Sequence, residues 1–477
     1  MTATAPGRRP ASRKLRGVRR SGTGPLWPPP TPRTDGPRPV GQGARRARPP
    51  LDRAAATGSP TPRQTLDTWL SVQSLNALRH AAALRPFAEG EFGTGGPAPT
   101  SGHLQATNQL IGGLRRGVLE LGHRVRLAAD AGRKSPTPAV LARTMTLKEQ
   151  AHDAVRAIEK VWDFYFELFG QRQGRYGFWL DACDQIALDC YQHTWVNLGQ
   201  ARSVPAPPPF SFMRTGFSPA TYRRGIPLSR LGRLPNPFPL IQLPYHRLVN
   251  PWTLGAVLHE VSHNLQSDLG LSGVVPARIE RDLLAAGASP EVAATWRGWN
   301  RESYADLSGL LLGGPCVVAS LMDVVGRSPA AVYAFTPGKP HPTPYIRVLL
   351  SCALLRRMGF AEDAARYRRT WTHLYPNPGS GIPAAMLSGL ERVLDIVVNA
   401  ACYTPYLQLG TSLAEVLRFA PKDQLLIEEA AGRLARGVDP GVLPERYLIG
   451  AVRVATERRL ASPAALTEHF YREISRR

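Results

Sequence analysis

The chain has 477 residues, of which 43% are hydrophobic and only 5 are Cys. This length and apolar content predict one large domain or two to three smaller ones, and they exclude both full disorder and a disulfide-stapled miniprotein. The formal net charge of +23 invites a nucleic-acid-binding interpretation, so its distribution along the chain matters.

The first segment, residues 1–64, carries about half of the excess charge. It holds 14 Lys and Arg against 2 Asp, a net charge of 14 − 2 = +12, together with 13 of the 45 Pro. Because it has almost no periodic apolar residues, we expect a disordered basic tail. The N-terminal Arg residues are followed by Pro and Gly and not by an apolar run, so we expect no secretory signal and a cytoplasmic protein.

Of the 59 Lys and Arg in the chain, 53 are Arg. This bias is typical of GC-rich bacterial coding, so charge alone is a weak argument for a nucleic-acid partner. Nucleic-acid binding through the tail stays open as an alternative function. Deleting the tail and measuring binding across a salt series would test it.

A helical N-terminal region is predicted for residues 65–204. Leu, Val and Ile recur at helical spacing over 65–84, 104–131 and 147–168, with a Gly- and Pro-rich loop at 90–102. Residues 176–198 fit a strand and a helix equally well.

A Pro-rich segment follows, with eleven Pro in residues 205–251. Such a density forbids long helices and central strands, so we expect extended, irregular chain. Its one short apolar run, Leu240–Leu243, is predicted to be an edge strand, to which an extended peptide could add as a further strand.

The helix predicted over residues 254–265 carries the first chemical motif. Its apolar residues fall within one arc of about 100°, and His259, Glu260 and His263 lie opposite them. The bland interpretation is a solvated helix face. However, two His four residues apart can both reach one metal, with Glu260 beside the water of a hydrolase, which is the His-Glu-x-x-His zinc pattern.

Catalytic zinc needs a third protein ligand, and a second helix offers one. Ser289, Pro290 and Glu291 are typical of a helix start, and further along this helix Glu302 and Asp306 share a face. An ordinary surface pair, with Arg301 as a partner, is the simpler interpretation. The apolar run that follows argues for burial, and a metal would offset the cost of a buried carboxylate.

The most apolar stretch, Leu307–Val325, is interrupted by Gly313, Gly314 and Pro315, so we predict a buried helix and a turn rather than a membrane span. The rest of the chain is mostly helical, over 345–357, 361–375, 384–401 and 424–474. The five Cys contain no CxxC pair, which favours reduced core thiols over disulfides or a thiolate metal site.

Three motifs in this order resemble the gluzincin zinc peptidases, and most closely the HtpX-like and CAAX-prenyl-protease group. They are His259–His263, Glu302–Asp306 as Glu-Ser-Tyr-Ala-Asp, and His341–Arg347 as a His-Pro element with Arg six residues after the His. The resemblance implies that one zinc ion is bound by His259, His263 and Glu302. It further implies that Glu260 is the general base, that Asp306 holds a ligand His, and that His341 and Arg347 line the site.

The sequence therefore predicts a mainly α (α+β) protein with a zincin-like metallopeptidase domain, a small edge sheet and a helical surround. The catalytic region is expected at 205–420 and a C-terminal helical segment at 421–477. Glu260 and His341 are the expected catalytic residues, with Tyr304, Tyr403 and Tyr406 behind His341 as further donors. The substrate would be a peptide or protein. A catalytically silent zinc-site sensor or scaffold is the alternative of another class.

Overall fold

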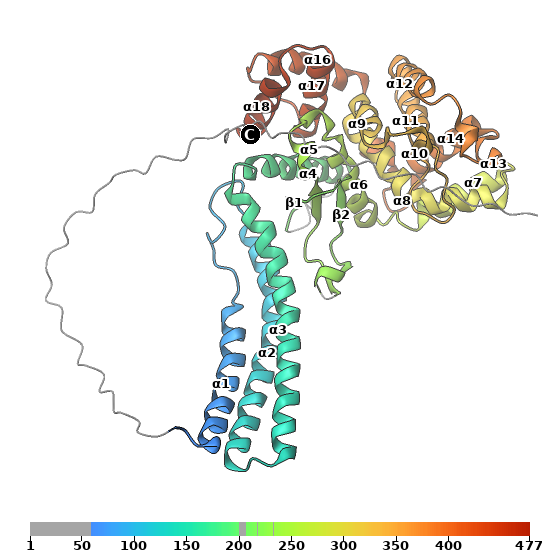
Figure 1. Ribbon diagram of the computed structural model, residues 1–477. Helices are drawn as coiled ribbons and strands as arrows, with labels where there is room; N and C mark the ends of the chain where they lie inside the picture. The colour runs from blue at the N-terminus through green and yellow to red at the C-terminus, as the bar shows by residue number, and fades with distance from the viewer. Residues whose placement is uncertain (1–58, 200–206, 217, 232) are drawn as a thin grey trace, which may run out of the picture. The chain divides into compact units, whose positions relative to one another are not determined.

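The computed structural model describes residues 59–477 apart from 200–206, 217 and 232. Almost all of the predicted basic tail therefore lies outside the described residues. The part from Pro60 to Arg477 forms one compact unit. Helices make up most of it and the strands are few and short, as predicted (Figure 1).

Three long helices open this unit: α1 (Pro62–Ala83), α2 (Ser101–Lys134) and α3 (Pro138–Gly170). They pack along one another (Figure 1). Each starts at a Thr whose side chain accepts a hydrogen bond from the backbone N–H three residues later, which satisfies a donor that a helix start leaves unpaired. All three helices begin before their predicted ranges, α3 by nine residues, because caps and not the apolar periodicity fix a helix start.

The ambiguous stretch is a helix, α4 (Gly177–Asn197). Its completely buried residues include Leu180, Cys183, Ile186 and Cys190, which recur every three to four positions. This spacing of buried residues is that of a helix and not of a strand, so it resolves the ambiguity of the sequence pattern.

The Pro-rich segment forms a three-stranded sheet in the order β1-β5-β2, from β1 (Phe210–Met213), β2 (Ala220–Tyr222) and β5 (Leu240–Leu243). The prediction that Leu240–Leu243 is an edge strand is wrong, because β5 pairs parallel with β1 and antiparallel with β2. Pro239 and Pro244 flank β5 without interrupting it, so all its N–H groups are available to the ladder.

Burial on both faces explains the apolar run of β5. Leu240 belongs to a core shared with the first three helices, whereas Ile241 and Leu243 belong to the main core. A small hairpin, β3 (Pro227–Leu228) with β4 (Leu234–Pro235), lies between β2 and β5 in the chain.

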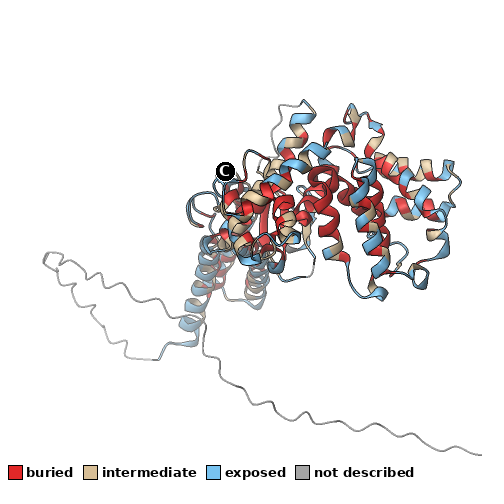
Figure 2. Cartoon of the chain, turned by 90° about the horizontal axis from the view of Figure 1, so that it is seen from above, coloured by how far each residue is buried: buried red, intermediate tan, exposed pale blue. Residues whose placement is uncertain are grey.

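Four helices build the centre of the main core: α6 (Gly255–Asp268), α8 (Pro290–Gly313), α9 (Pro315–Val325) and α11 (Pro344–Arg357). Figure 2 shows helices that are buried along their length beside others that alternate buried and exposed turns. The remaining helices are α5 (Tyr245–Leu248), α7 (Val274–Ala285), α10 (Pro329–Val332), α12 (Ala361–Leu374), α13 (Ala384–Leu387), α14 (Leu390–Val398), α15 (Leu413–Val416), α16 (Pro421–Ala435), α17 (Glu445–Glu457) and α18 (Pro463–Ile474). Short 3-10 or π turns cover 171–173, 229–231, 251–253, 378–380 and 399–403, and β6 (Pro405–Tyr406) pairs with β7 (Thr411–Ser412).

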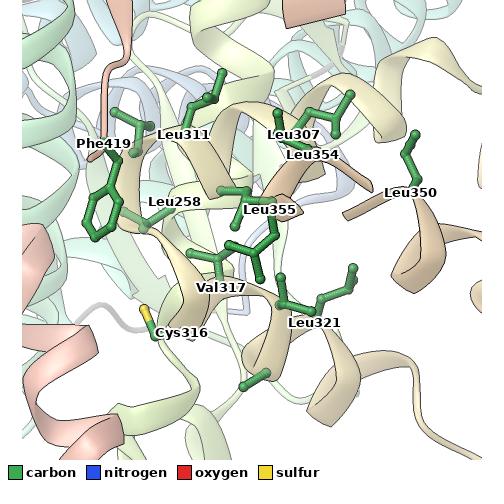
Figure 3. Packing of buried hydrophobic residues seen from close by; sticks show 14 of the residues in the cluster. Leu258, Leu307, Leu311, Cys316, Val317, Leu321, Leu350, Leu354, Leu355 and Phe419 are labelled. Carbon is green, nitrogen blue, oxygen red and sulfur yellow. The ribbon is translucent and has the colours of Figure 1, made fainter. Parts of the chain in front are cut away.

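The apolar stretch at 307–325 is the end of α8, a turn and α9, as predicted. Gly314 makes the turn with φ +70°, a conformation that favours Gly. Side chains of α6, α8, α9 and α11 interdigitate here, among them Leu258, Leu311 and Leu355 (Figure 3). Among the described residues, no helix combines the length and the apolar character that a membrane crossing requires.

Candidate metal centre

Helix α6 presents the His-Glu-x-x-His motif. The predicted apolar stripe, which includes Val257, Leu258 and Val261, is completely buried. The opposite face is not solvated, since Glu260 and His263 are only 5% and 4% exposed. These side chains instead line a cavity of about 260 Å³. The simpler interpretation, that this face of the helix is solvated, is therefore excluded.

Helix α8 brings Glu302 to the two His. Ser289 caps this helix and Pro290 is its first residue, as the sequence predicts. Glu302 Oε2 lies 3.5 Å from His259 Nε2, and Glu302 Oε1 lies 3.6 Å from His263 Nε2. One ligand atom from each of these three residues lies within 4.8 Å of the others, so the group could hold a metal ion.

The close approach of α8 to α6 depends on Gly309. A Cβ at this position would lie 3.3 Å from the backbone N of His259, which is tighter than most real contacts. The two helices thus pack almost backbone to backbone beside the ligand group.

Asp306 and Arg347 fix the orientation of the His259 ring through its Nδ1 atom. Asp306 Oδ1 is 2.9 Å from His259 Nδ1, and Arg347 donates to both oxygens of Asp306 at 2.7 and 2.8 Å. A bidentate Arg–carboxylate pair is strong and directional. It fixes the imidazole ring so that Nε2 faces Glu302 and the cavity.

The charge states follow from burial and from these contacts. Burial lowers the pKa of His259, but hydrogen bonds with Asp306 and Glu302 outweigh burial and raise the pKa to about 10. Burial raises the pKa of Glu302, yet the hydrogen bond with His259 holds it well below its ordinary value. For Asp306, burial is likewise outweighed by Arg347 and His259, and its pKa is lowered. Without a metal, a protonated His259 therefore balances ionised carboxylates.

The other two motif residues behave differently. Burial and the charge of His259 lower the pKa of His263 to about 3, so its imidazole is neutral, the form that binds metals. Burial raises the pKa of Glu260 to about 7, although the charge of His259 acts the other way. A carboxyl group with a pKa near neutrality suits both acceptance and return of a proton. His263 Nδ1 is buried and finds no hydrogen-bond partner within the described residues.

His341 also reaches the cavity. It lies in the loop before α11, its side chain is 64% exposed, and its Nε2 is 3.6 Å from Glu302 Oε2. All seven predicted site residues, from His259 to Arg347, are among those that line this one cavity.

The three Tyr expected behind His341 do not line this cavity. Tyr304 is completely buried in the core. The Tyr406 hydroxyl donates to the carbonyl of Ala400 at 2.6 Å, and the Tyr403 ring lies under the guanidinium of Arg357. The structure therefore offers none of them as a donor to a bound ligand.

Several lining residues were missed by the sequence analysis. The β2 segment, by which we mean residues 218–221 leading into and beginning β2, forms one wall, and Arg301 forms part of another. The simpler interpretation, a surface pair with Arg301, is excluded, because Glu302 and Asp306 are buried and Asp306 pairs with Arg347 instead. No local pattern marks the β2 segment, since only sheet pairing brings it beside α6. The remaining wall is largely apolar and comes from α6, α8 and α9, including Leu310, Val317 and Leu321.

The five Cys are all buried and unpaired, as predicted. Burial raises the pKa of the Cys316 and Cys352 thiols to about 12, so they stay protonated at neutral pH and are poor metal ligands.

Comparisons with known proteins found no match to this chain. The chain matches no protein-family model, no curated protein and no solved structure.

Proposed function

We propose that the protein is a zinc-dependent metallopeptidase in which His259, His263 and Glu302 hold the zinc and Glu260 is the general base. The observation that carries the proposal is the convergence of these four side chains, from α6 and α8, on one cavity. The resemblance to gluzincins rests on the same residues.

The donor set fits zinc. Two imidazole nitrogens and one carboxylate oxygen form the His₂Glu set that catalytic zinc sites use, with a position left for water or substrate. The charge of the site fits as well, because Glu302 and Asp306 are ionised and are balanced in part by Arg347 and by the proton of His259. A divalent cation would take over the role of the His259 proton.

The mechanism assigns each remaining task to a residue of the chain. When bound, zinc supplies Lewis acidity that polarises the scissile carbonyl and makes water more acidic. Glu260 takes up the proton of the attacking water and delivers it to the leaving amine. His341, exposed at the cavity, donates a hydrogen bond to the developing oxyanion. Arg347 is engaged by Asp306 and keeps His259 oriented.

The free edge of β2 offers a place for the peptide backbone. Among the described strands, in the order β1-β5-β2, β2 is paired on one side only, and residues 218–221 line the cavity. Asn264 donates to the Thr221 hydroxyl at 2.9 Å, which ties this strand to the motif helix. An extended peptide added to β2 would lie beside α6, whereas both sides of β5 are already occupied.

The metal site is tested by the zinc content of the purified chain. We expect close to one zinc per chain in the wild type and loss of zinc in His263→Ala. His373→Ala is the matched control, because this His lies on α12 and does not line the cavity. Equal zinc content in both variants would contradict the ligand assignment.

Catalysis is tested separately with Glu260→Gln. We expect this variant to keep its zinc and to lose cleavage of a synthetic peptide mixture by at least about 100-fold, as for removal of a general base. Unchanged cleavage would refute the role of Glu260. Zinc binding without cleavage of any peptide by the wild type would support the alternative of a catalytically silent sensor or scaffold.

A further inference from the structure

Two Arg of α8, one turn apart, have different surroundings. Arg297 makes an ion pair with Glu280, with 2.6 Å between Nη1 and Oε2. Arg301 lines the cavity, and no carboxylate of the described residues lies within ion-pair distance of its guanidinium. Its positive charge acts on Glu260 and His263, which places it close to the reacting groups.

The charge of a second guanidinium, that of Arg223, interacts with the charge of Arg301. Arg223 directly follows β2, is half-buried, and likewise has no ion-pair partner in the described part of the chain. Burial and the neighbouring charge of Arg301 lower the pKa of Arg223, although Asp268 acts against this. The Asp268 carboxylate accepts a hydrogen bond from Tyr191 at 3.3 Å and forms no ion pair with either Arg.

Two like charges held close together, one of them half-buried, cost free energy unless an anion compensates them. Within the described residues no carboxylate forms an ion pair with either guanidinium, so Asp268 and Glu260 compensate these charges only at longer range. The planar guanidinium group matches a carboxylate through two parallel hydrogen bonds, which makes Arg well suited to recognise one.

We propose that Arg301, which lines the cavity without an ion-pair partner among the described residues, binds a carboxylate of the substrate, so that the enzyme prefers peptides with a carboxylate close to the scissile bond. The inference rests on the proposed function and names its substrate class. The carboxylate is either an acidic side chain or the free C-terminus of a peptide. A role in balancing the charge of Glu260 alone would affect all peptides alike, which separates the two explanations.

The experiment uses the zinc-loaded full chain and four versions of one cleavable peptide chosen from the synthetic mixture. They carry Glu or Gln beside the cleavage site and end in a free or an amidated C-terminus. We expect kcat/KM to be about tenfold higher for the version with the recognised carboxylate, the size of one charged hydrogen bond. The Glu/Gln and acid/amide pairs identify which carboxylate is bound.

Arg301→Gln should abolish this preference, whereas Arg297→Gln should keep it. Because Arg301 is exposed, its replacement should leave the unfolding midpoint unchanged, which circular dichroism checks. Equal ratios in wild type and Arg301→Gln, or equal losses for all four peptides, would overturn the proposal.

A binding measurement keeps this test independent of turnover. Fluorescence anisotropy with the Glu260→Gln protein should show about tenfold weaker binding of the amidated or Gln version, and the difference should shrink as salt rises. In the double variant that carries Glu260→Gln and Arg301→Gln, this difference in binding should disappear. Absence of cleavage by the wild type together with carboxylate-selective binding would contradict the peptidase proposal but support the carboxylate site. Cleavage without carboxylate-selective binding would support the peptidase proposal but contradict the carboxylate site.

Discussion

Asp306 connects the candidate ligands to the protein interior, because its carboxylate serves His259 on one side and Arg347 on the other. Both residues are buried, since Arg347 is 8% exposed and Asp306 is 3% exposed. A neutral amide at this position would leave the buried guanidinium without a compensating charge, and it would offer one acceptor oxygen to Arg347 and the Nδ1–H of His259 where the carboxylate offers two.

We therefore predict two effects of Asp306→Asn. The free energy of unfolding should fall by about 3 kcal/mol, as for a broken buried ion pair, and zinc affinity should fall about 10- to 100-fold. Urea unfolding and competition with a chelator measure these effects. Asp395→Asn is the control, because its pair with Arg356 is exposed, and it should change stability by less than about 0.5 kcal/mol. An equal effect of both substitutions would contradict the role given to Asp306.

His103 is a titrating group in the core away from the candidate metal centre. Its Nε2–H donates to the Pro208 carbonyl at 2.9 Å, and its Nδ1 accepts from the Thr100 N–H at 3.3 Å. Burial lowers the pKa of His103 from 6.5 to about 4. A proton on Nδ1 would also remove the acceptor that completes the cap of α2.

This lowered pKa predicts a loss of stability in acid. Above pH 6.5 the imidazole is neutral in both states, whereas between pH 6.5 and 4 only the unfolded chain binds the proton, so unfolding becomes easier as pH falls. From pH 7 to 5 this contributes about 2 kcal/mol. The variant His103→Gln keeps a capping side chain but does not titrate, so its unfolding free energy should fall by about that much less over the same range. Parallel pH curves for the two proteins would show that His103 does not titrate as described.

At the scale of elements, the sequence predicts what local periodicity and caps determine. The motif helix and α8 are examples, because the apolar spacing and the Ser289 cap are both local signals. The central position of β5 could not be predicted in this way, since it depends on pairing with strands about 20 to 30 residues earlier in the chain. Arg301 was missed as a cavity residue for a similar reason, because only tertiary packing distinguishes it from Arg297.

The turn between α8 and α9 offers a sharp test of packing. Gly314 has φ +70°, and a Cβ there would lie 2.2 Å from the Phe419 ring. Gly314→Ala must therefore strain the backbone and displace an aromatic side chain, so we expect a loss of about 2–4 kcal/mol in the free energy of unfolding.

For Gly298, on α8, we expect a substitution by Ala to change the free energy of unfolding in the opposite direction. It is exposed, and nothing lies within 4 Å of the position that a Cβ would take. Because Ala is a better helix former than Gly, Gly298→Ala should stabilise the protein by about 0.5–1 kcal/mol. Urea unfolding of both variants checks the pair, and a similar change in both would show that packing at the turn is not decisive.

At the scale of the molecule, the C-terminal helices share one core with the candidate metal centre. The main hydrophobic cluster runs from α4 to α18 and includes Leu258 beside the motif and Ile449 on α17. Arg446 ties three elements together. Its Nη1 donates to both carboxylate oxygens of Asp189 on α4, at 2.8 and 2.9 Å, and its Nε donates to the carbonyl of Leu312 at the end of α8.

Because Arg446 is only 2% exposed, its replacement by Ala should act on the whole core. We expect Arg446→Ala to lower the free energy of unfolding by about 3–5 kcal/mol, since it leaves Asp189 and the end of α8 without their partner. Zinc release and loss of helical signal should occur at the same urea concentration, because Leu312 and the proposed ligand Glu302 belong to one helix. Arg458→Ala, at the C-terminal end of α17, removes an exposed pair with Glu428 and should change stability by less than about 1 kcal/mol. Zinc release from Arg446→Ala well before helix unfolding would instead mean that the C-terminal helices and the metal centre unfold independently.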